Sequence, residues 1–279
     1  MQGSEATSST GNYFKLSCDI QLAGYSNWEP AGTLDTPFTG HFDGQGHTIY
    51  INIAPLPLTT GNYIRMTYDR SLFGVIESGG DAIVNLDVEG IARGYNAGGI
   101  ASVLKAGNIR NCSFSGDITV TTSPSGETAM KYLIEELEDD DIQTADQVEI
   151  LDDVITKTRE YGKINAGGIA AVMLGGEIDS CTFRGNVAAE ANLTPANAGG
   201  IVGRMMNDSA AISGCYIEGD SVITASTADN DYDALANAGG IAGYANTQLD
   251  STIDSCKFDG TVNSTYYAGG IAGLVRGTI

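Results

Sequence analysis

The sequence predicts an all-β protein, a right-handed parallel β-helix in which three short strands form each coil of about 30 residues. Three observations predict this solenoid: a Gly-Gly-Ile phrase that occurs five times, an Ile-x-x-Cys-x-Phe-x-Gly phrase that follows it, and 37 glycines among 279 residues. This glycine share is about twice the usual value of roughly 7%. It indicates regular tight turns, because glycine adopts backbone conformations that other residues avoid.

The first phrase is Ala-Gly-Gly-Ile-Ala at residues 97–101, and related copies begin at Ala166, Ala198, Ala238 and Ala268. Its second glycines stand at positions 99, 168, 200, 240 and 270, so the successive intervals are 69, 32, 40 and 30 residues. Thirty residues fit one three-sided coil with its turns, whereas a propeller blade needs about 40 to 45 residues and antiparallel hairpins. When the insertion in the longest interval is set aside, the chain has the length of about eight coils. At roughly 4.8 Å per coil, these would form a rod about 40 Å long.

The second phrase, at residues 109–116 in its first full copy, alternates Cys and Phe with polar residues. It returns at 178–185, 212–219 and 253–260, and a variant at 83–90 has Leu86 in place of the cysteine. Alternation with period 2 is typical of a strand with one buried face. A third, weaker apolar stretch follows the closing glycine, as at Ile118 and Val120. We expect one strand from each phrase.

Stacking of the coils places four cysteines in an inward ladder. Its members are Cys112, Cys181, Cys215 and Cys256, with Leu86 as a cap. Parallel Cβ atoms about 4.8 Å apart exceed the roughly 3.5–4.5 Å of a disulfide, which favours reduced thiols and leaves bridges between rungs as the alternative. Together with Cys18, the chain has five cysteines. It contains no Cys-x-x-Cys motif, which argues against a zinc site or a thioredoxin-like site.

The long interval contains a different segment, residues 128–161. Met130, Leu133, Ile134 and Leu137 form the stripe of an amphipathic helix, and a second helix starts at Thr144. We expect a small α-helical hairpin insertion, either a binding element or tolerated loop growth. The acidic run at 135–141 is interpreted as a solvated hairpin tip. The predicted organisation is an N-terminal cap and first coils at 1–127, the insertion at 128–161 and further coils at 162–279, with one continuous solenoid from 12 to 279.

The formal net charge of −21 at pH 7 argues against nucleic acid and anionic membrane surfaces as partners. No stretch approaches the roughly 18 apolar residues of a membrane span. Residues 1–13 lack the basic start and apolar run of a secretory leader. We expect an extracellular or cell-surface protein whose leader is not part of this chain, with a cytoplasmic protein as the alternative.

The sequence resembles proteins that carry the GLUG repeat, named for a Gly-Leu/Ile-x-Gly core. That core is seen at residues 240–243 and 270–273, and residues 38–49 (FTGHFDGQGHTI) resemble the stretch that opens such β-helices. The resemblance covers nearly the whole chain outside the insertion. It implies a secreted or surface-anchored microbial protein, and similar repeats also occur beside the protease domain of IgA-specific metalloendopeptidases. That class needs His-Glu-x-x-His, whereas this chain has only His41 and His47, neither followed by Glu.

One column of outward side chains is a candidate carbohydrate-cleaving site, because many parallel β-helices cleave polysaccharides. The column consists of Glu89, Ser115, Arg184, Glu218 and Asp259. Adjacent coils separate such side chains by about 5 Å, which suits a retaining carboxylate pair. However, the column mixes charge signs, so surface decoration explains it better. The fold alone is weak support for an activity.

Asp229, Asp231 and Asp233 alternate in one loop and are the best candidate for a calcium site. The loop lacks the glycine and distal glutamate of a helical calcium loop, so a solvated acidic loop is favoured. Four tyrosines are candidates for a sugar-stacking surface: Tyr232, Tyr244, Tyr266 and Tyr267. His41 and His47 flank an Asp-Gly turn and are interpreted as structural.

We therefore predict no catalytic, cofactor-binding or metal-binding residue. The predicted function is a non-enzymatic surface module, adhesin-like or a spacer, whose partners are extracellular glycans or host and matrix proteins. The alternatives are a carbohydrate-active β-helix enzyme and an accessory domain of a larger secreted protease. Ile279 falls where another Ile-x-x-Cys phrase would begin, so we expect the last coil to be continued or covered by a partner.

Overall fold

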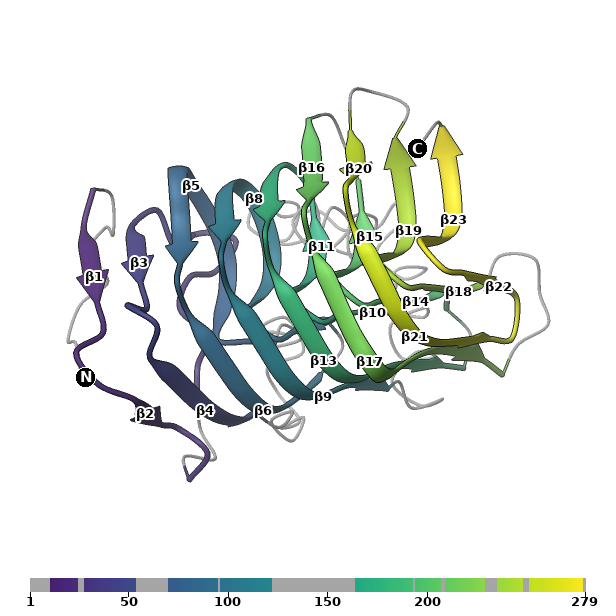
Figure 1. Cartoon of the computed structure of the whole chain (residues 1–279), viewed down its shortest axis with the longest axis horizontal. Coiled ribbons are helices and arrows are strands. Elements are labelled where there is room, and N and C mark those ends of the chain that lie inside the picture. Colours follow the sequence, from purple (N-terminus) through teal and green to yellow (C-terminus); the bar gives the residue numbers. More distant parts are fainter. Residues whose placement is uncertain are drawn as a thin grey trace, which may run out of the picture.

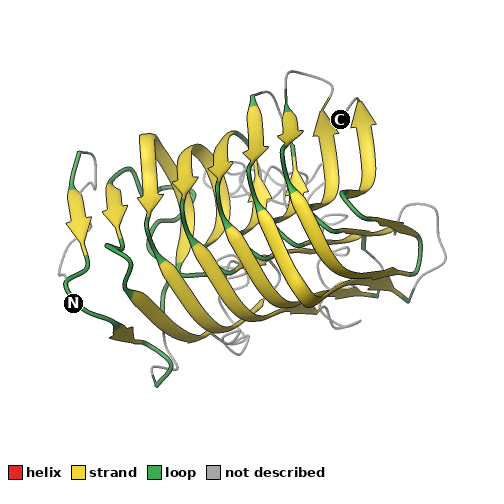
Figure 2. Ribbon diagram, in the orientation of Figure 1, coloured by secondary structure: helices red, strands yellow, loops and turns green. Residues whose placement is uncertain are grey.

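The computed structural model describes residues 11–24, 28–53, 70–94, 96–121, 164–192, 194–206, 209–228, 235–247 and 251–277. These residues form strands joined by turns and loops, without a helix (Figure 2). The strands follow one another along a single axis from the N-terminal to the C-terminal end (Figure 1), and neighbouring strands pair in parallel. The chain is a parallel β-helix, as the sequence predicts. Its right-handed sense stays a prediction from the general preference of parallel crossovers.

Three sheets form the three sides of the solenoid. Sheet A contains β1 (Tyr13–Lys15), β3 (His41–Asp43), β5 (Phe73–Val84), β8 (Ala101–Arg110), β11 (Ala170–Met173), β15 (Val202–Met205), β19 (Ala242–Thr247) and β23 (Ala272–Gly277), together with β12 (Gly176–Asp179), β16 (Ala210–Ser213) and β20 (Thr252–Asp254). Sheet B contains β2 (Ile20–Gln21), β4 (Thr48–Ile53), β6 (Asp87–Gly94), β9 (Ser113–Thr121), β13 (Thr182–Ala191), β17 (Tyr216–Thr227) and β21 (Lys257–Ser264). Sheet C contains β7 (Asn96–Gly98), β10 (Ile164–Gly167), β14 (Ala196–Gly199), β18 (Ala236–Gly239) and β22 (Tyr267–Gly269).

The phrases of the repeat are distributed over the three sides differently from the prediction. The second and third phrases share one strand, since β9 runs from Ser113 to Thr121 through the closing glycine Gly116. Gly116 has a φ of 144° and Gly185 a φ of 137°, conformations that let glycine continue a strand where another residue would end it. The third side is sheet C. Its strands contain the Ala-Gly that opens the first phrase and the Asn directly before it. The expected one strand per phrase is therefore wrong, although each full coil has three sides.

One apolar core fills the axis of the solenoid. Inward side chains of successive coils stack on each other, and Ile109, Ile178 and Ile212 are all fully buried. The rings of Phe114 and Phe183 lie nearly parallel, with centroids 6.1 Å apart. Because each coil buries its inward side chains against those of its two neighbours, stacking of like residues gives one continuous core.

The Gly-Gly pair makes the turn from sheet C to sheet A, and its second glycine has a packing role. A Cβ atom added at Gly168 would lie 2.5 Å from Cδ2 of Phe183 and would also collide with the carbonyl oxygen of Gly200 in the next coil. The same two obstacles, an aromatic ring and the next glycine carbonyl, surround Gly99 and Gly240. Only glycine allows the coils to approach this closely at the turn.

The turn from sheet A to sheet B uses one residue in the left-handed conformation in each coil. This residue is the third of the Ile-x-x-Cys phrase, namely Asn85, Asn111, Ser180, Gly214 and Ser255, with φ between 51° and 59°. Asn and Gly tolerate this conformation best, whereas β-branched residues avoid it. The variable third position of the phrase is therefore restricted to small or polar residues.

A ladder of buried asparagines runs along sheet C and was missed by the sequence analysis. The side-chain amide of Asn165 donates to Asn96 Oδ1 (2.8 Å), that of Asn197 to Asn165 Oδ1 (2.9 Å), and that of Asn237 to Asn197 Oδ1 (2.8 Å). The next coil has Tyr267 in this register, so the buried Asn237 Oδ1 has no hydrogen-bond partner. An Asn before four of the five Ala-Gly-Gly copies was the available signal.

The expected helical hairpin at 128–161 lies outside the described residues. Strand β13 nevertheless pairs directly with β9, so the solenoid is continuous across the intervening segment in sheet B. In the described part of the chain, no helical segment has the length and hydropathy needed to cross a membrane. The predicted domain boundaries stay a prediction.

We predict that Gly168→Ala destabilises the protein by about 3 kcal/mol or more, because the added methyl group must displace both a ring and a backbone carbonyl. Denaturant unfolding followed by circular dichroism measures this loss. The matched control is Gly270→Ala at the same repeat position of the last described coil, where nothing lies within 4 Å of the added Cβ. Equal losses in the two variants would contradict the packing role.

We also predict that Asn197→Ala costs about 3 kcal/mol, since it removes two buried hydrogen bonds, one to Asn165 Oδ1 and one from the Asn237 amide. Asn237→Ala removes one such bond from the end of the ladder and is expected to cost about 1 kcal/mol. The same unfolding measurement compares them. A larger loss for Asn237→Ala would show that the ladder is not the cause.

Candidate functional site

Sheet B carries the open face of the described solenoid. Sheet C offers little surface, since all residues of β10, β14 and β18 are buried. On sheet A, Val75, Val103 and Val172 are buried in a second apolar cluster against which Leu34 packs. On sheet B, by contrast, the residues that alternate with the core positions are exposed or half-buried along β9 and β13. Sheet B therefore presents a regular row of accessible side chains to a ligand.

The predicted carboxylate column lies on this open face. Glu89 pairs with Ser115 in the register of β6 and β9, and Ser115 with Arg184 in that of β9 and β13. Arg184 Nε lies 3.9 Å from Glu218 Oε2, with about two thirds of the Arg184 side chain exposed. The register of β17 with β21 shifts between Ile217 and Ser221. Such an exposed ion pair contributes little to stability.

This column is poorly suited to acid–base catalysis. A retaining glycosidase needs one carboxyl group whose pKa is raised by an apolar, buried environment. Glu218 is about two fifths exposed and faces a cation, and Asp259 is exposed. Neither group lies in the buried, apolar environment that such an acid requires. The arrangement offers mixed charges for recognition instead.

An aromatic residue and a cation also meet on the open face. Tyr216 follows Thr182 in the adjacent column, and Lys257 Nζ lies 4.8 Å from the centre of the Tyr216 ring. This cation–π contact holds the lysine over the ring. Of the four tyrosines proposed for sugar stacking, Tyr244 is buried beneath Arg204, whose Cζ lies 5.7 Å from the ring. Tyr266 and Tyr267 are exposed, and Tyr232 lies outside the described residues.

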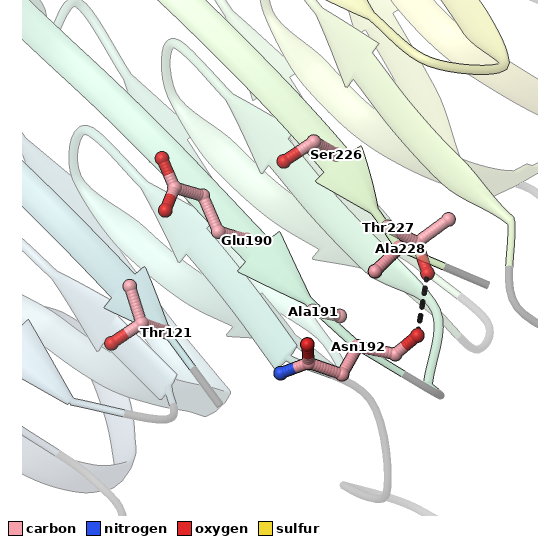
Figure 3. Close-up of a pocket in the computed structure, with 7 residues that line it drawn as sticks. All are labelled: Thr121, Glu190, Ala191, Asn192, Ser226, Thr227 and Ala228. Atoms are coloured by element: carbon pink, nitrogen blue, oxygen red, sulfur yellow. Dashed lines mark hydrogen bonds between the residues drawn. The ribbon is translucent and has the colours of Figure 1, made fainter. Parts of the chain in front are cut away.

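A hollow of about 360 Å³ lies where sheet B ends (Figure 3). It is lined by Thr121, Glu190, Ala191, Asn192, Ser226, Thr227 and Ala228. Thr121, Glu190 and Ser226 are neighbours in three successive strands, and the Thr227 hydroxyl donates to the Asn192 carbonyl oxygen at 3.3 Å. Hydroxyl, amide and carboxylate groups from several coils thus line one open polar depression.

His41 and His47 contact different groups at the N-terminal end. The His41 ring stacks on Tyr13, with centroids 4.5 Å apart, and His47 Nδ1 lies 3.2 Å from Asp19 Oδ1. Between them, Asp43 Oδ1 accepts hydrogen bonds from the Gln45 backbone amide (3.0 Å) and the Asn85 side chain (3.1 Å). The Asn85 bond, followed by those from Gln45, holds the pKa of the Asp43 carboxyl below its usual value. These contacts fit a structural turn.

The candidate calcium loop with Asp229, Asp231 and Asp233 lies outside the described residues, as does the acidic run at 135–141. Within the described ranges, no group of three or more His, Cys, Asp or Glu side chains is arranged to hold a metal ion.

One charged cluster escaped the sequence analysis. Arg110 places its guanidinium nitrogens 3.4 Å from Asp81, 3.5 Å from Glu177 and 3.3 Å from Asp179. These residues come from three successive coils of sheet A. The available sequence signal was that Arg110 and Asp179 occupy the same position of the second phrase. The cluster therefore surrounds one guanidinium with three carboxylates on sheet A.

The comparisons with known proteins agree with this architecture. The family model of the GLUG motif matches residues 93–121, which span one coil from the end of β6 through β7 and β8 to the end of β9. No curated protein matches the chain. A crystal structure of a "putative immunoglobulin A1 protease" from Bacteroides ovatus is similar over 97% of this chain and 79% of that chain, with a TM-score of 0.54 and 19% sequence identity. At this identity the likeness shows a shared fold, and together with the motif it confirms the predicted resemblance.

We predict that Asp43→Ala destabilises the protein by about 1 kcal/mol at pH 7, as loss of a capping side chain does. Because the folded-state pKa of Asp43 is lowered, its contribution is present above the ordinary value of about 3.9 and is lost as pH falls through the lowered pKa. Thermal unfolding at pH 7 and pH 2 measures the difference. Asp35→Ala, at an exposed position, is the control, and a loss that is unchanged at pH 2 would contradict the prediction.

Proposed function

We propose that this GLUG-repeat β-helix is a non-enzymatic extracellular or cell-surface module that binds glycans at the open face of sheet B. The observation that carries the proposal is the polar hollow at the end of that face, lined by Glu190, Asn192, Ser226 and Thr227. Sugars present many hydroxyl groups, and side-chain carboxylates, amides and hydroxyls are their natural hydrogen-bond partners. The adjoining strands supply a rigid support for these groups.

Composition supports a glycan over other ligand classes. The hollow contains only two alanines as apolar lining residues, so an apolar ligand would leave its polar groups unpaired. The net charge of −21 repels nucleic acid and anionic lipid surfaces. Tyr216, half-buried beside the hydroxyl of Thr182, offers an aromatic surface on the same face.

The thiols are compatible with an extracellular location. Unpaired cysteines are unusual in oxidising compartments, yet the chain has five, four of them in the ladder. Three ladder cysteines are buried, and the spacing of parallel strands opposes bridges between rungs. The three buried ladder thiols can therefore stay reduced in such a compartment.

A carbohydrate-active enzyme is the main alternative, with Glu218 and Asp259 as its carboxylates. It is disfavoured because both groups are solvent-accessible and Glu218 faces Arg184. An accessory role beside a secreted protease is a further alternative, and it rests on the family resemblance and on fold similarity to a protein described by that activity. Fold similarity by itself is an associational argument.

Affinity electrophoresis through gels cast with bacterial, plant and host polysaccharides tests the proposal. We expect retardation by at least one neutral or weakly charged glycan, without a cleared zone. Glu190→Ala and Asn192→Ala should each raise the dissociation constant by roughly tenfold, the value of about one hydrogen bond. Glu77→Ala is the control, because Glu77 is an exposed carboxylate on sheet A that pairs with Lys105 at 2.8 Å.

The outcomes separate the alternatives. A cleared zone would make the protein an enzyme. Free migration in every gel would contradict glycan binding and favour a spacer or a protein-binding module. Retardation that Glu77→Ala weakens as much as Glu190→Ala would place the binding surface elsewhere.

A further inference from the structure

The hollow at the end of sheet B contains one carboxylate, that of Glu190. Of the described residues that line the hollow, Glu190 alone has an ionisable side chain. This side chain is exposed, and within the described part of the chain no ion pair or hydrogen bond joins its carboxylate to another residue. The hollow therefore presents an uncompensated negative charge to a ligand.

The neighbours of Glu190 are polar but not basic. Thr121 and Ser226 hold the same register as Glu190 in the strands on either side of β13, and Figure 3 shows the Glu190 side chain between these two strands. The preceding outward residue of β13 is Ala188. By contrast, the carboxylate of Glu218 on the same sheet lies 3.9 Å from the guanidinium of Arg184. Glu190 thus has hydroxyl groups beside it and no cation in register.

The backbone holds this carboxylate in a fixed position. The residues before and after it, Ala189 and Ala191, are buried in the core, and β13 pairs with a strand on each side. The Thr227 hydroxyl donates to the Asn192 carbonyl oxygen at 3.3 Å and joins the ends of β13 and β17. Groups on such rigid strands keep the geometry that selective recognition needs.

The chemistry of these groups specifies a ligand. An ionised carboxylate only accepts hydrogen bonds, an ammonium group has three donors, and hydroxyl groups do both. Charge-assisted bonds of this kind are about twice as strong as neutral ones. A sugar that carries a free amino group combines one ammonium with several hydroxyls in a small volume. A lysine side chain has the same charge, but it carries that charge on an apolar stem without hydroxyl groups.

On the premise of the proposed glycan-binding function, we propose that the hollow binds an amino sugar with a free amino group. The ammonium group pairs with Glu190, and ring hydroxyls bond to Thr121 and Ser226. The hollow of about 360 Å³ lies within the range of roughly 300–1,000 Å³ of small-molecule sites. N-acetylation of the sugar removes the positive charge, so the acetylated form loses the contact with Glu190.

Calorimetric titration of the full chain at pH 6 tests this specificity, since a primary amine is protonated at that pH. The probes are a tetrasaccharide of glucosamine and its fully N-acetylated counterpart. Salt of about 0.15 M limits the influence of remote surface charges, because the Debye length is then about 8 Å. We expect the glucosamine form to bind at least roughly tenfold more tightly.

Two substitutions in the hollow separate charge from hydrogen bonding. Glu190→Gln keeps the size of the side chain and removes its charge, so it should abolish the preference for the free amine. Ser226→Ala should weaken binding of both tetrasaccharides by roughly fivefold, the value of one neutral hydrogen bond, and leave the preference intact. Circular dichroism establishes that each variant is folded.

Glu89→Gln is the matched control, because Glu89 is an exposed carboxylate of sheet B that does not line the hollow. It changes the net charge equally and should leave both affinities unchanged. Tetralysine, the second control, should bind at least roughly tenfold more weakly than the glucosamine tetrasaccharide.

The amino-sugar assignment is overturned by equal affinity for the two tetrasaccharides, by a preference that survives Glu190→Gln or disappears in Glu89→Gln, or by tetralysine binding as tightly as the sugar. Its failure is distinguishable from failure of the glycan proposal. If the gels still retard the protein while the two tetrasaccharides bind equally or not at all, only the amino-sugar specificity is wrong. Free migration in every gel together with no binding of either tetrasaccharide would contradict both.

Discussion

Each coil of this β-helix has to accept copies of its own backbone about 4.8 Å away on either side. The Gly-Gly turn meets this constraint most tightly, because the ring of Phe183 and the carbonyl of Gly200 occupy the space that a Cβ at Gly168 would need. The phenylalanine of one phrase and the glycine of another are therefore one packing unit. Their joint recurrence is the physical basis of the repeat, and the same glycine in the last described coil, Gly270, has no neighbour within that space.

In-register stacking also determines which polar groups the solenoid can bury. An asparagine amide both donates and accepts, so Asn165 and Asn197 each donate to the preceding asparagine of the ladder and accept from the next one. A thiol donates weakly to backbone carbonyls, as Cys181 does to Asp179 and Ile109, and otherwise packs as a small apolar group. Both ladders depend on unbroken repetition, and the asparagine ladder stops where Tyr267 enters its register.

The outward side chains do not have to match those of the next coil. We therefore expect the functional residues at outward positions. On sheet B the outward residues vary from coil to coil: Glu89, Ser115 and Arg184 occupy one column, while Thr121, Glu190 and Ser226 line the hollow. The proposed glycan site uses side chains from successive coils, so the axial spacing of the fold also spaces its polar groups.

The sequence by itself determined the parallel β-helix, the approximate number of coils and the cysteine ladder with its Leu86 cap, because in-register stacking turns a sequence period directly into spatial contact. It also placed Glu89, Ser115 and Arg184 in one column. The tertiary structure decided which side of the solenoid is open, that Tyr244 is buried, that Arg110 binds three carboxylates, and that a hollow lies beside Glu190 and Asn192. These features depend on how variable residues of different coils and the outer surfaces of the sheets pack, and no sequence period records that packing.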